Sequence, residues 1–196
     1  IKDKISLFCD VDKEAVISLV TSETIYEVPL VLEDAGLGEF IVRRLGLRAE
    51  DSNLEEWRAM VAKLKAPKEA ITIGLVGKYV GLRDAYYSVR EALCHAALAH
   101  NRAVKIEWLD SEQLDGMADD KLRQVQGIIV PGGFGYRGIE GMIKAAKFAR
   151  KRDTPYLGLC LGMHIMVIEL GRHVFHTDKV NSTEFDAASG YPVIDL

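Results

Sequence analysis

The stretch that decides the fold is PYLGLCLG, residues 155–162, a short apolar run that ends at a cysteine placed between two glycines. The residues that follow it, 161–173, have the composition of a helix. A strand that turns into a helix across a G-x-C-x-G sequence is typical of a nucleophile elbow. The sequence therefore predicts an α/β domain in which Cys160 stands on the tight turn after a strand.

Outward from this junction, the chain beyond residue 70 alternates between apolar runs and helical stretches. The other apolar runs are residues 71–77, 104–110 and 127–133, and the other helical stretches are residues 83–100, 111–124 and 139–151. Alternation at this spacing predicts β-α-β crossovers, and hence an α/β fold with a flavodoxin-like parallel sheet and helices on both faces. Since ligands bind beyond the carboxyl ends of such strands, we expect the chemistry at that edge.

The first 70 residues are predicted to be mainly helical. A short apolar run over residues 4–9 indicates a strand, and Asp10-Val11-Asp12 indicates the start of a helix that extends to about residue 20. Apolar spacing predicts two further helices within residues 25–45, separated near Gly36 and Gly38. A last helix is expected from the capping sequence at residues 51–53 to about Lys65.

Composition narrows the class of protein. The 196 residues are 48% hydrophobic and 28% charged, with a net charge of −4, which argues against a nucleic-acid binder. No apolar run approaches the roughly 20 residues of a membrane helix. Three widely spaced cysteines exclude a disulfide framework and favour a reducing, cytoplasmic setting, and no cysteine and histidine spacing predicts a metal site. The chain starts at Ile1 without an initiator Met or signal peptide, so we expect a fragment.

The G-x-C-x-G junction has a chemical consequence. The helix after Cys160 directs its partial positive charge at the thiol and favours the thiolate. The Leu161 amide is then placed to stabilise an oxyanion. A second donor, the Gly133 amide, is expected from the glycine-rich sequence VPGGFGYRG at residues 130–138, beside Cys160 on the neighbouring strand. The alternatives are a buried structural cysteine and a simple tight turn or phosphate loop, although the loop lacks a G-K-[ST] ending.

A thiol nucleophile needs a base, and the histidines do not supply an obvious one. His164 follows Cys160 by one helical turn, but the elbow directs the thiol away from its own helix, so His164 is expected only to line a pocket. The remaining histidines are expected to have structural or solvated roles; they are His95, His100, His173 and His176.

Three motifs together resemble the class I glutamine amidotransferases, specifically those of the CTP synthase family. They are PGGFGYRG at residues 131–138, YLGLCLGM at 156–163 and NSTEF at 181–185. KISLF at residues 4–8 and IYEVP at residues 25–29 look like the end of a synthetase domain. The resemblance implies the C-terminal part of a synthetase (amidoligase) domain over residues 1–48 and an interdomain helix and linker over 49–69. Residues 70–196 would be an amidotransferase domain truncated before its catalytic His and Glu, which the family places in a later H-P-E segment.

The resemblance also implies an activity. Cys160 would attack the side-chain amide of glutamine, with the Gly133 and Leu161 amides holding the oxyanion. In the full-length enzyme, the released ammonia would aminate UTP to CTP in an ATP-dependent step served by Mg²⁺. GTP would act as the activator, and the enzyme would be a cytoplasmic homotetramer. The incomplete chain alone is expected to be inactive. The residues implied in glutamine binding are Gly133, Leu161, Gly162, Met163, His164 and Glu184.

Further positions carry nucleotide roles by the same resemblance. Lys4 matches a family lysine that contacts UTP or CTP. Residues Val20, Thr21 and Ser22 lie near the family's ATP site, where they replace a Lys-Asp-Val stretch. His164 stands where the family has Gln. The candidates for a lid or a GTP site are Phe134, Tyr136 and Arg137.

Two alternatives belong to other functional classes. In the first alternative, the chain is a non-catalytic regulatory or assembly module with a glutaminase-like fold. In the second, it is another thiol hydrolase that uses a nucleophile elbow. The hydrolase alternative accounts for Cys160 but leaves NSTEF, KISLF and PGGFGYRG unexplained. A mature protein of only about 22 kDa in the source cell would favour the regulatory module.

Overall fold

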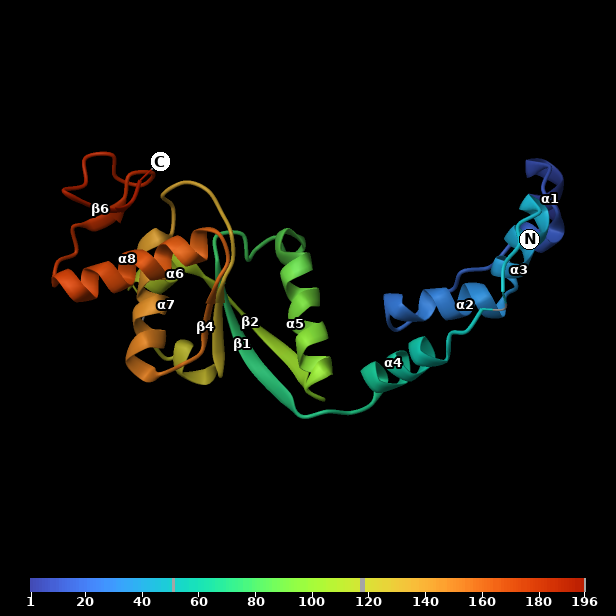
Figure 1. Ribbon diagram of the computed structural model, residues 1–196, viewed down its shortest axis with the longest axis horizontal. Coiled ribbons are helices and arrows are strands. Elements are labelled where there is room, and N and C mark those ends of the chain that lie inside the picture. Colours follow the sequence, from blue (N-terminus) through green and yellow to red (C-terminus); the bar gives the residue numbers. More distant parts are fainter. Residues whose placement is uncertain (51, 117–118, 196) are drawn as a thin grey trace. The chain divides into compact units, whose positions relative to one another are not determined.

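The computed structural model describes residues 1–50, 52–116 and 119–195 (Figure 1). The chain divides into two compact units, Ile1–Pro67 and Lys68–Leu196, which are described separately. None of the described helices combines the length and the apolar character needed to cross a bilayer.

The first unit consists of short helices without a large core. Its elements are α1 (Lys2–Cys9), the 3-10 helices η1 (Lys13–Ala15) and η2 (Ile25–Glu27), α2 (Val28–Asp34), α3 (Leu37–Leu45) and α4 (Glu55–Lys65). Among its described hydrophobic residues, only Val61 is buried. Polar contacts tie α4 to η2: the Trp57 indole donates to the Tyr26 carbonyl at 2.7 Å, and Lys65 pairs with Glu27 at 2.8 Å.

Two predictions for this unit are wrong. Residues 4–9 belong to α1 rather than to a strand, since a strand needs a partner and no strand occurs among the described residues of this unit. The helix predicted up to residue 20 shrinks to η1, because Val16 is extended and Ile17 follows it, and β-branched residues weaken a helix.

The two helices predicted within residues 25–45 are confirmed as α2 and α3. Gly36, with φ of +78°, separates them, whereas Gly38 lies inside α3. The last predicted helix is confirmed as α4. At its start, Asn53 Oδ1 accepts from the Glu55 amide at 3.0 Å, and Asp51 of the predicted capping sequence lies outside the described residues.

The second unit contains a parallel sheet of the strand order β2-β1-β3-β4. Its strands are β1 (Ala70–Gly77), β2 (Ala103–Asp110), β3 (Gly127–Val130) and β4 (Tyr156–Gly158). Its helices are η3 (Arg83–Tyr86), α5 (Tyr87–Ala99), α6 (Ser111–Gly116), η4 (Leu122–Gln124), α7 (Ile139–Arg152) and α8 (Leu161–Phe175). A separate parallel pair follows, formed by β5 (Val180–Ser182) and β6 (Tyr191–Ile194).

Helices cover both faces of this sheet (Figure 1). On the α5 face, Leu75 and Ile129 pack with Tyr86. On the opposite face, Val76 and Val130 join a larger cluster with apolar residues of α7 and α8. This arrangement confirms the predicted fold class, and the strand order corresponds to a flavodoxin-like sheet.

Several predicted elements are shorter than expected. The run at residues 127–133 forms a strand only up to Val130, because Pro131 has no amide to donate to a neighbouring strand. The helix predicted over residues 111–124 is divided between α6 and η4, and residues 117–118 lie outside the described part of the chain.

The sheet brings the candidate chemistry to one edge. The registers pair Gly77 with Asp110, Leu75 with Ile129 and Val130 with Gly158, so the four strands end within one residue of the same level. The residues that follow these ends, among them the 131–138 loop and Cys160, therefore meet at the carboxyl edge.

Candidate active site

Cys160 occupies a strained turn between β4 and α8. Its backbone has φ of 51° and ψ of −109°, a conformation that residues other than glycine rarely adopt, and the residue is exposed. Such strain persists only where the surroundings impose it, and it is concentrated at functional sites. The geometry agrees with the predicted nucleophile elbow.

The two glycines beside Cys160 leave no room for a side chain. A Cβ built on Gly158 would lie 2.3 Å from the backbone of Gly162, and a Cβ on Gly162 would lie 2.0 Å from the Val130 carbonyl oxygen. Both clashes involve backbone atoms that cannot rotate away. The turn therefore requires glycine two positions before and two positions after the cysteine.

The first turn of α8 offers backbone donors next to the thiol. The amides of Met163 and His164 donate to the Cys160 carbonyl at 2.9 and 3.3 Å. Leu161 is the first residue of the helix, so its amide has no acceptor within the helix. The partial positive charge of this end favours a thiolate at Cys160 and an oxyanion beside it.

The glycine-rich 131–138 loop lies against the elbow. A Cβ built on Gly132 would lie 3.6 Å from Cβ of Cys160, and one built on Gly133 would lie 3.3 Å from Cδ2 of Leu161. The neighbouring strands β3 and β4 thus bring the two residues predicted to donate to an oxyanion, Gly133 and Leu161, to the same side of the sheet.

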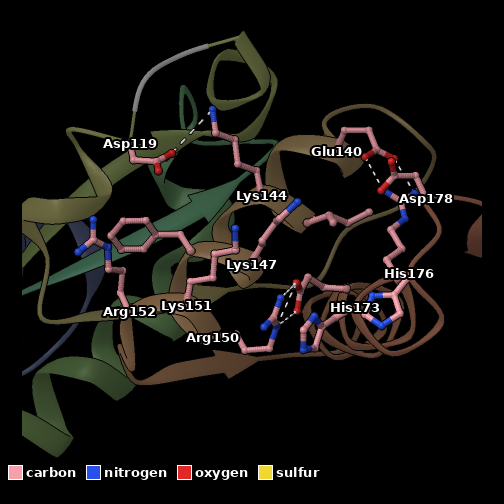
Figure 2. A pocket seen from close by; sticks show the side chains of 14 residues that line it. Asp119, Glu140, Lys144, Lys147, Arg150, Lys151, Arg152, His173, His176 and Asp178 are labelled. Carbon is pink, nitrogen blue, oxygen red and sulfur yellow. Dashed lines mark hydrogen bonds and ion pairs between the residues drawn. The ribbon is translucent and has the colours of Figure 1, made fainter.

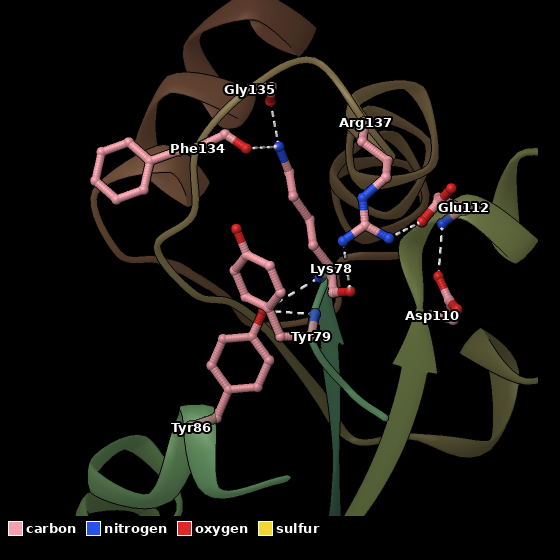
Figure 3. Close-up of polar contacts among 8 residues, drawn as sticks. All are labelled: Lys78, Tyr79, Tyr86, Asp110, Glu112, Phe134, Gly135 and Arg137. Carbon is pink, nitrogen blue, oxygen red and sulfur yellow. Dashed lines mark hydrogen bonds and ion pairs between the residues drawn. The ribbon is translucent and has the colours of Figure 1, made fainter. Parts of the chain in front are cut away.

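Lys78, at the end of β1, holds this loop in place (Figure 3). Its side chain is 5% exposed, and its ammonium donates to the carbonyls of Phe134, at 2.9 Å, and Gly135. In return, Arg137 Nη2 donates to the Lys78 carbonyl at 3.3 Å and also forms an ion pair with Glu112 of α6.

The surroundings of Lys78 disfavour the charged form of its ammonium group. Burial is the main cause that lowers its pKa from the ordinary value of 10.5, and the nearby Arg137 lowers it further. The carboxylates of Glu184 and Glu112 act in the opposite direction. Lys78 is not among the site residues predicted from the sequence, where the available signal is a lysine directly after the apolar run at residues 71–77.

Residues 81–188 match the family model described as glutamine amidotransferase class-I. The chain belongs to this family. Residues 1–47 match a second model, described as CTP synthase N-terminus. The amidotransferase match covers β2, β3, β4 and the elbow, so it includes the turn that carries Cys160.

Curated relatives extend the likeness to the whole chain. The CTP synthase of Dehalococcoides mccartyi is 58% identical over 197 aligned residues, covering 100% of this chain and 36% of that protein. The CTP synthase of Roseiflexus castenholzii is 56% identical over 198 aligned residues, again 100% of this chain and 36% of that protein. The chain thus spans about a third of the length of these relatives.

A solved structure resembles the same region. It is the glutaminase domain of the Trypanosoma brucei CTPS with bound acivicin, with 40% sequence identity and a TM-score of 0.59. The match covers 64% of this chain and 50% of that one. The amidotransferase is therefore similar to CTP synthases in its elbow domain and in its first 47 residues.

The other residues expected around the amidotransferase site occupy different environments. Met163 is about half exposed at the start of α8, and Gly162 is buried. Glu184 follows β5, is exposed, and donates its amide to Ser182 Oγ at 3.2 Å. Nδ1 of His164 is buried and has no hydrogen-bond partner among the described residues.

The loop tip carries two large exposed rings. Phe134 and Tyr136 are each 82% exposed. Side chains of this size, held at the edge of a candidate site on a glycine-rich loop, suit the predicted role in a lid. No described side chain makes a hydrogen bond to the Cys160 thiol, so the described residues show no partnered base.

The predicted nucleotide-site residues lie in the first unit. Lys4 is exposed on α1, and Val20 and Thr21 are exposed in a segment without regular structure, next to the partly buried Ser22. Among the described residues there is no group of three or more His, Cys, Asp or Glu side chains that suits a metal ion. The described residues of this chain therefore do not fit a Mg²⁺ site.

A separate cavity of about 940 Å³ lies along α7 and α8 (Figure 2). Several of its charged groups are paired: Arg150 makes a bidentate pair with Glu169, Arg172 makes another with Glu140, and Lys144 lies 3.9 Å from Asp119. None of the predicted site residues lines it. We therefore place the candidate active site at the carboxyl edge of the sheet, where Cys160, Leu161 and Gly133 meet.

Proposed function

We propose that the second unit is the glutaminase domain of a CTP synthase, with Cys160 as its nucleophile. The observation that carries this proposal is the strained turn of Cys160, which is enclosed by glycines that admit no Cβ and faced by the glycine-rich loop. The likeness to CTP synthases over the whole chain supports the same assignment.

The proposed chemistry follows from the elbow. The Cys160 thiolate attacks the side-chain amide carbon of glutamine and forms a carbon–sulfur bond, so the carbonyl oxygen becomes an oxyanion. The amides of Leu161 and Gly133 donate to that oxyanion. Collapse of the intermediate breaks the carbon–nitrogen bond and releases ammonia, once the leaving nitrogen has taken a proton. Water then hydrolyses the thioester to glutamate and restores the thiol.

We infer a glutamine pocket from the residues beside this turn. Gly133, Leu161, Gly162 and Met163 would surround the side-chain amide, and the Glu184 carboxylate would attract the α-ammonium group. His164 would contribute to the wall of the pocket. Its buried Nδ1, which lacks a partner among the described residues, supports a position where a ligand group supplies a hydrogen bond.

The remaining assignments concern the whole enzyme. We propose the C-terminal part of a synthetase domain over residues 1–48, an interdomain helix and linker over 49–69, and the amidotransferase domain over 70–196. Ammonia would aminate UTP in an ATP- and Mg²⁺-dependent step. GTP would activate the enzyme, which would be a cytoplasmic tetramer.

We also propose roles for residues outside the glutamine pocket. Lys4 would contact UTP or CTP, and Val20–Ser22 would adjoin ATP. Phe134, Tyr136 and Arg137 would form the lid or GTP site. The similarity to CTP synthases supports these proposals.

Selective labelling tests the nucleophile. The chloroketone analogue of glutamine is incubated with the protein, and the adducts are located by mass spectrometry. Cys160 is expected to react at least tenfold faster than Cys9, which is also exposed and serves as the internal control, because only Cys160 has an oxyanion site beside it. Equal labelling of the two thiols would exclude a glutamine site at the elbow.

A second experiment separates the two nitrogen sources. In the enzyme that carries this chain, Cys160→Ala should abolish CTP formation from glutamine and preserve CTP formation from added ammonia. The reason is that ammonia enters after the thiol-dependent step. If the variant lost both activities equally, Cys160 would not be the nucleophile of a glutaminase.

A further inference from the structure

The contacts of Lys78 are unusual for a lysine. Its side chain is buried, and its ammonium donates to two consecutive backbone carbonyls, those of Phe134 and Gly135. No ion pair involving Lys78 occurs among the described residues, so carbonyl oxygens replace the water lost on burial. Such an arrangement costs desolvation energy, and an apolar side chain of similar length would fill the space at lower cost.

The backbone of Lys78 is also held by hydrogen bonds. The Tyr86 hydroxyl accepts hydrogen bonds from the amides of both Lys78 and Tyr79, at 3.1 Å each. A Cβ on Gly77 would lie 2.6 Å from the same hydroxyl oxygen, so this exit from β1 needs glycine. The path of the chain from β1 into Lys78 is therefore fixed by Tyr86 of η3.

Lys78 also controls the orientation of the loop. In a trans peptide the carbonyl and the amide point in opposite directions, so the two carbonyls directed at Lys78 turn the amides of Gly135 and Tyr136 away from it and fix the two peptides that follow Phe134. A Cβ built on Gly133 would lie 3.5 Å from Cδ and 3.8 Å from Cε of Lys78, so the lysine methylenes support the loop directly beneath Gly133. The same glycine is the predicted oxyanion donor beside Cys160.

We propose that Lys78 is a positioning residue that holds the 131–138 loop so that the Gly133 amide faces the oxyanion formed at Cys160. This inference rests on the proposed glutaminase function. Lys78 touches neither glutamine nor the thiol in this role; it acts through the loop.

The test compares two alkylating reagents on the enzyme that carries this chain. The thiolate first adds to the ketone carbon of the glutamine chloroketone and forms a tetrahedral oxyanion. The sulfur then bonds to the adjacent methylene carbon and displaces chloride, and the first carbon–sulfur bond breaks as the ketone is restored. Iodoacetamide alkylates the same thiolate by direct displacement of iodide and needs no oxyanion donor. The ratio of their second-order rate constants at Cys160 therefore reports the oxyanion loop separately from thiol reactivity.

Lys78→Met keeps the length of the side chain and removes the donors. We expect the chloroketone rate constant and kcat for glutamine hydrolysis to fall roughly 10- to 100-fold, somewhat less than the loss of a whole oxyanion donor. The iodoacetamide rate constant should stay within about twofold. Lys105→Met, which removes an exposed lysine on β2, is the matched control and should change neither rate.

Three outcomes would overturn the proposal. Equal loss with both reagents would show general damage to the elbow, and no loss with either would show that the loop does not depend on Lys78. If Lys78→Met does not fold, Lys78→Gln takes its place, because its side chain is one bond shorter and carries no ammonium group; an unchanged ratio of the two rates in that folded variant also contradicts the role. Failure of the underlying function appears differently, as chloroketone labelling that is not selective for Cys160 in the unmodified enzyme.

Discussion

The two strand-to-helix connections at the active edge are built in different ways. The β4-to-α8 turn is as short as a connection can be, and its shape is imposed by backbone contacts of Gly158 and Gly162. The β3-to-α7 loop contains four glycines, and contacts with residues distant in the sequence, chiefly Lys78 and Glu112, hold it in place. The nucleophile is thus held by local sterics, whereas the oxyanion loop depends on tertiary contacts.

This difference agrees with the roles proposed for the turn, which carries the nucleophile, and for the loop, which carries an oxyanion donor. A nucleophile must keep one position, and a turn that tolerates no Cβ keeps it at the cost of a strained φ of 51° at Cys160. The loop, which carries the exposed Phe134 and Tyr136 rings, is held by a few hydrogen bonds instead. Substitutions in the turn should therefore act on stability more strongly than substitutions in the loop.

The largest effect is expected from Gly162→Ala in the turn. Its Cβ would lie 2.0 Å from the Val130 carbonyl oxygen, which forces β3 and α8 apart, and we expect a loss of more than about 4 kcal/mol in the free energy of unfolding. Urea denaturation measures this loss. Gly190→Ala, where no atom lies within 4 Å, is the control and should be nearly neutral. A small effect at Gly162 would mean that the turn is adaptable.

Gly138→Ala, at the end of the loop, should cost less. Its φ of +69° and the approach to Ser111 Oγ predict a loss of about 2–3 kcal/mol. Gly135→Ala, with φ of +74° but open space, should lose only about 1 kcal/mol. Combining Gly138→Ala with Ser111→Gly should recover part of the larger loss. If the two glycine variants were equally unstable, crowding by Ser111 would not contribute.

Tyr86, which is buried, and Tyr156, which is partly buried, provide a pair of tyrosines whose hydroxyls bond to the backbone. Tyr86→Phe leaves two amides without their acceptor and should cost about 2 kcal/mol, whereas Tyr156→Phe removes one donor to the Gly162 carbonyl, at 2.9 Å, and should cost about 1 kcal/mol. Thermal or urea unfolding ranks the two variants, and the reverse order would contradict the larger cost of leaving two amides without an acceptor.

The same tyrosines make a prediction about pH. Burial raises the pKa of both phenols above the ordinary value of 10.0. Above that pH the unfolded chain loses phenolic protons that the folded chain retains, so stability should be full below pH 10 and should fall as the pH rises further. Each Phe variant should show a shallower alkaline decline than the unmodified protein, and an equally steep decline would contradict the assignment.

The smallest effect is expected at the ion pair between Arg137 and Glu112. The two side chains are 51% and 43% exposed, so Glu112→Gln should cost less than about 1 kcal/mol. The difference should shrink further in 1 M salt, because salt screens exposed charges. Glu69→Gln, at the exposed pair with Arg102, is the control. A loss that persists at high salt would show that this pair is a main tether of the loop.

The N-terminal unit shows where sequence reasoning failed. Residues 4–9 are apolar enough for a strand, but a strand depends on a partner, and the run instead forms α1. Lys78 was missed for a related reason. Its acceptors are the carbonyls of Phe134 and Gly135, 56 and 57 positions away, and nothing near Lys78 in the sequence indicates them.

The sequence by itself determined the alternation of strands and helices, the family motifs and the position of Cys160 in its turn. These features follow from hydrophobic periodicity and from clashes among residues a few positions apart, which any chain with this sequence experiences. Only the tertiary structure decided which side chains hold the oxyanion loop. Those contacts exist because the order β2-β1-β3-β4 brings the ends of distant strands together, and no local interaction determines that order.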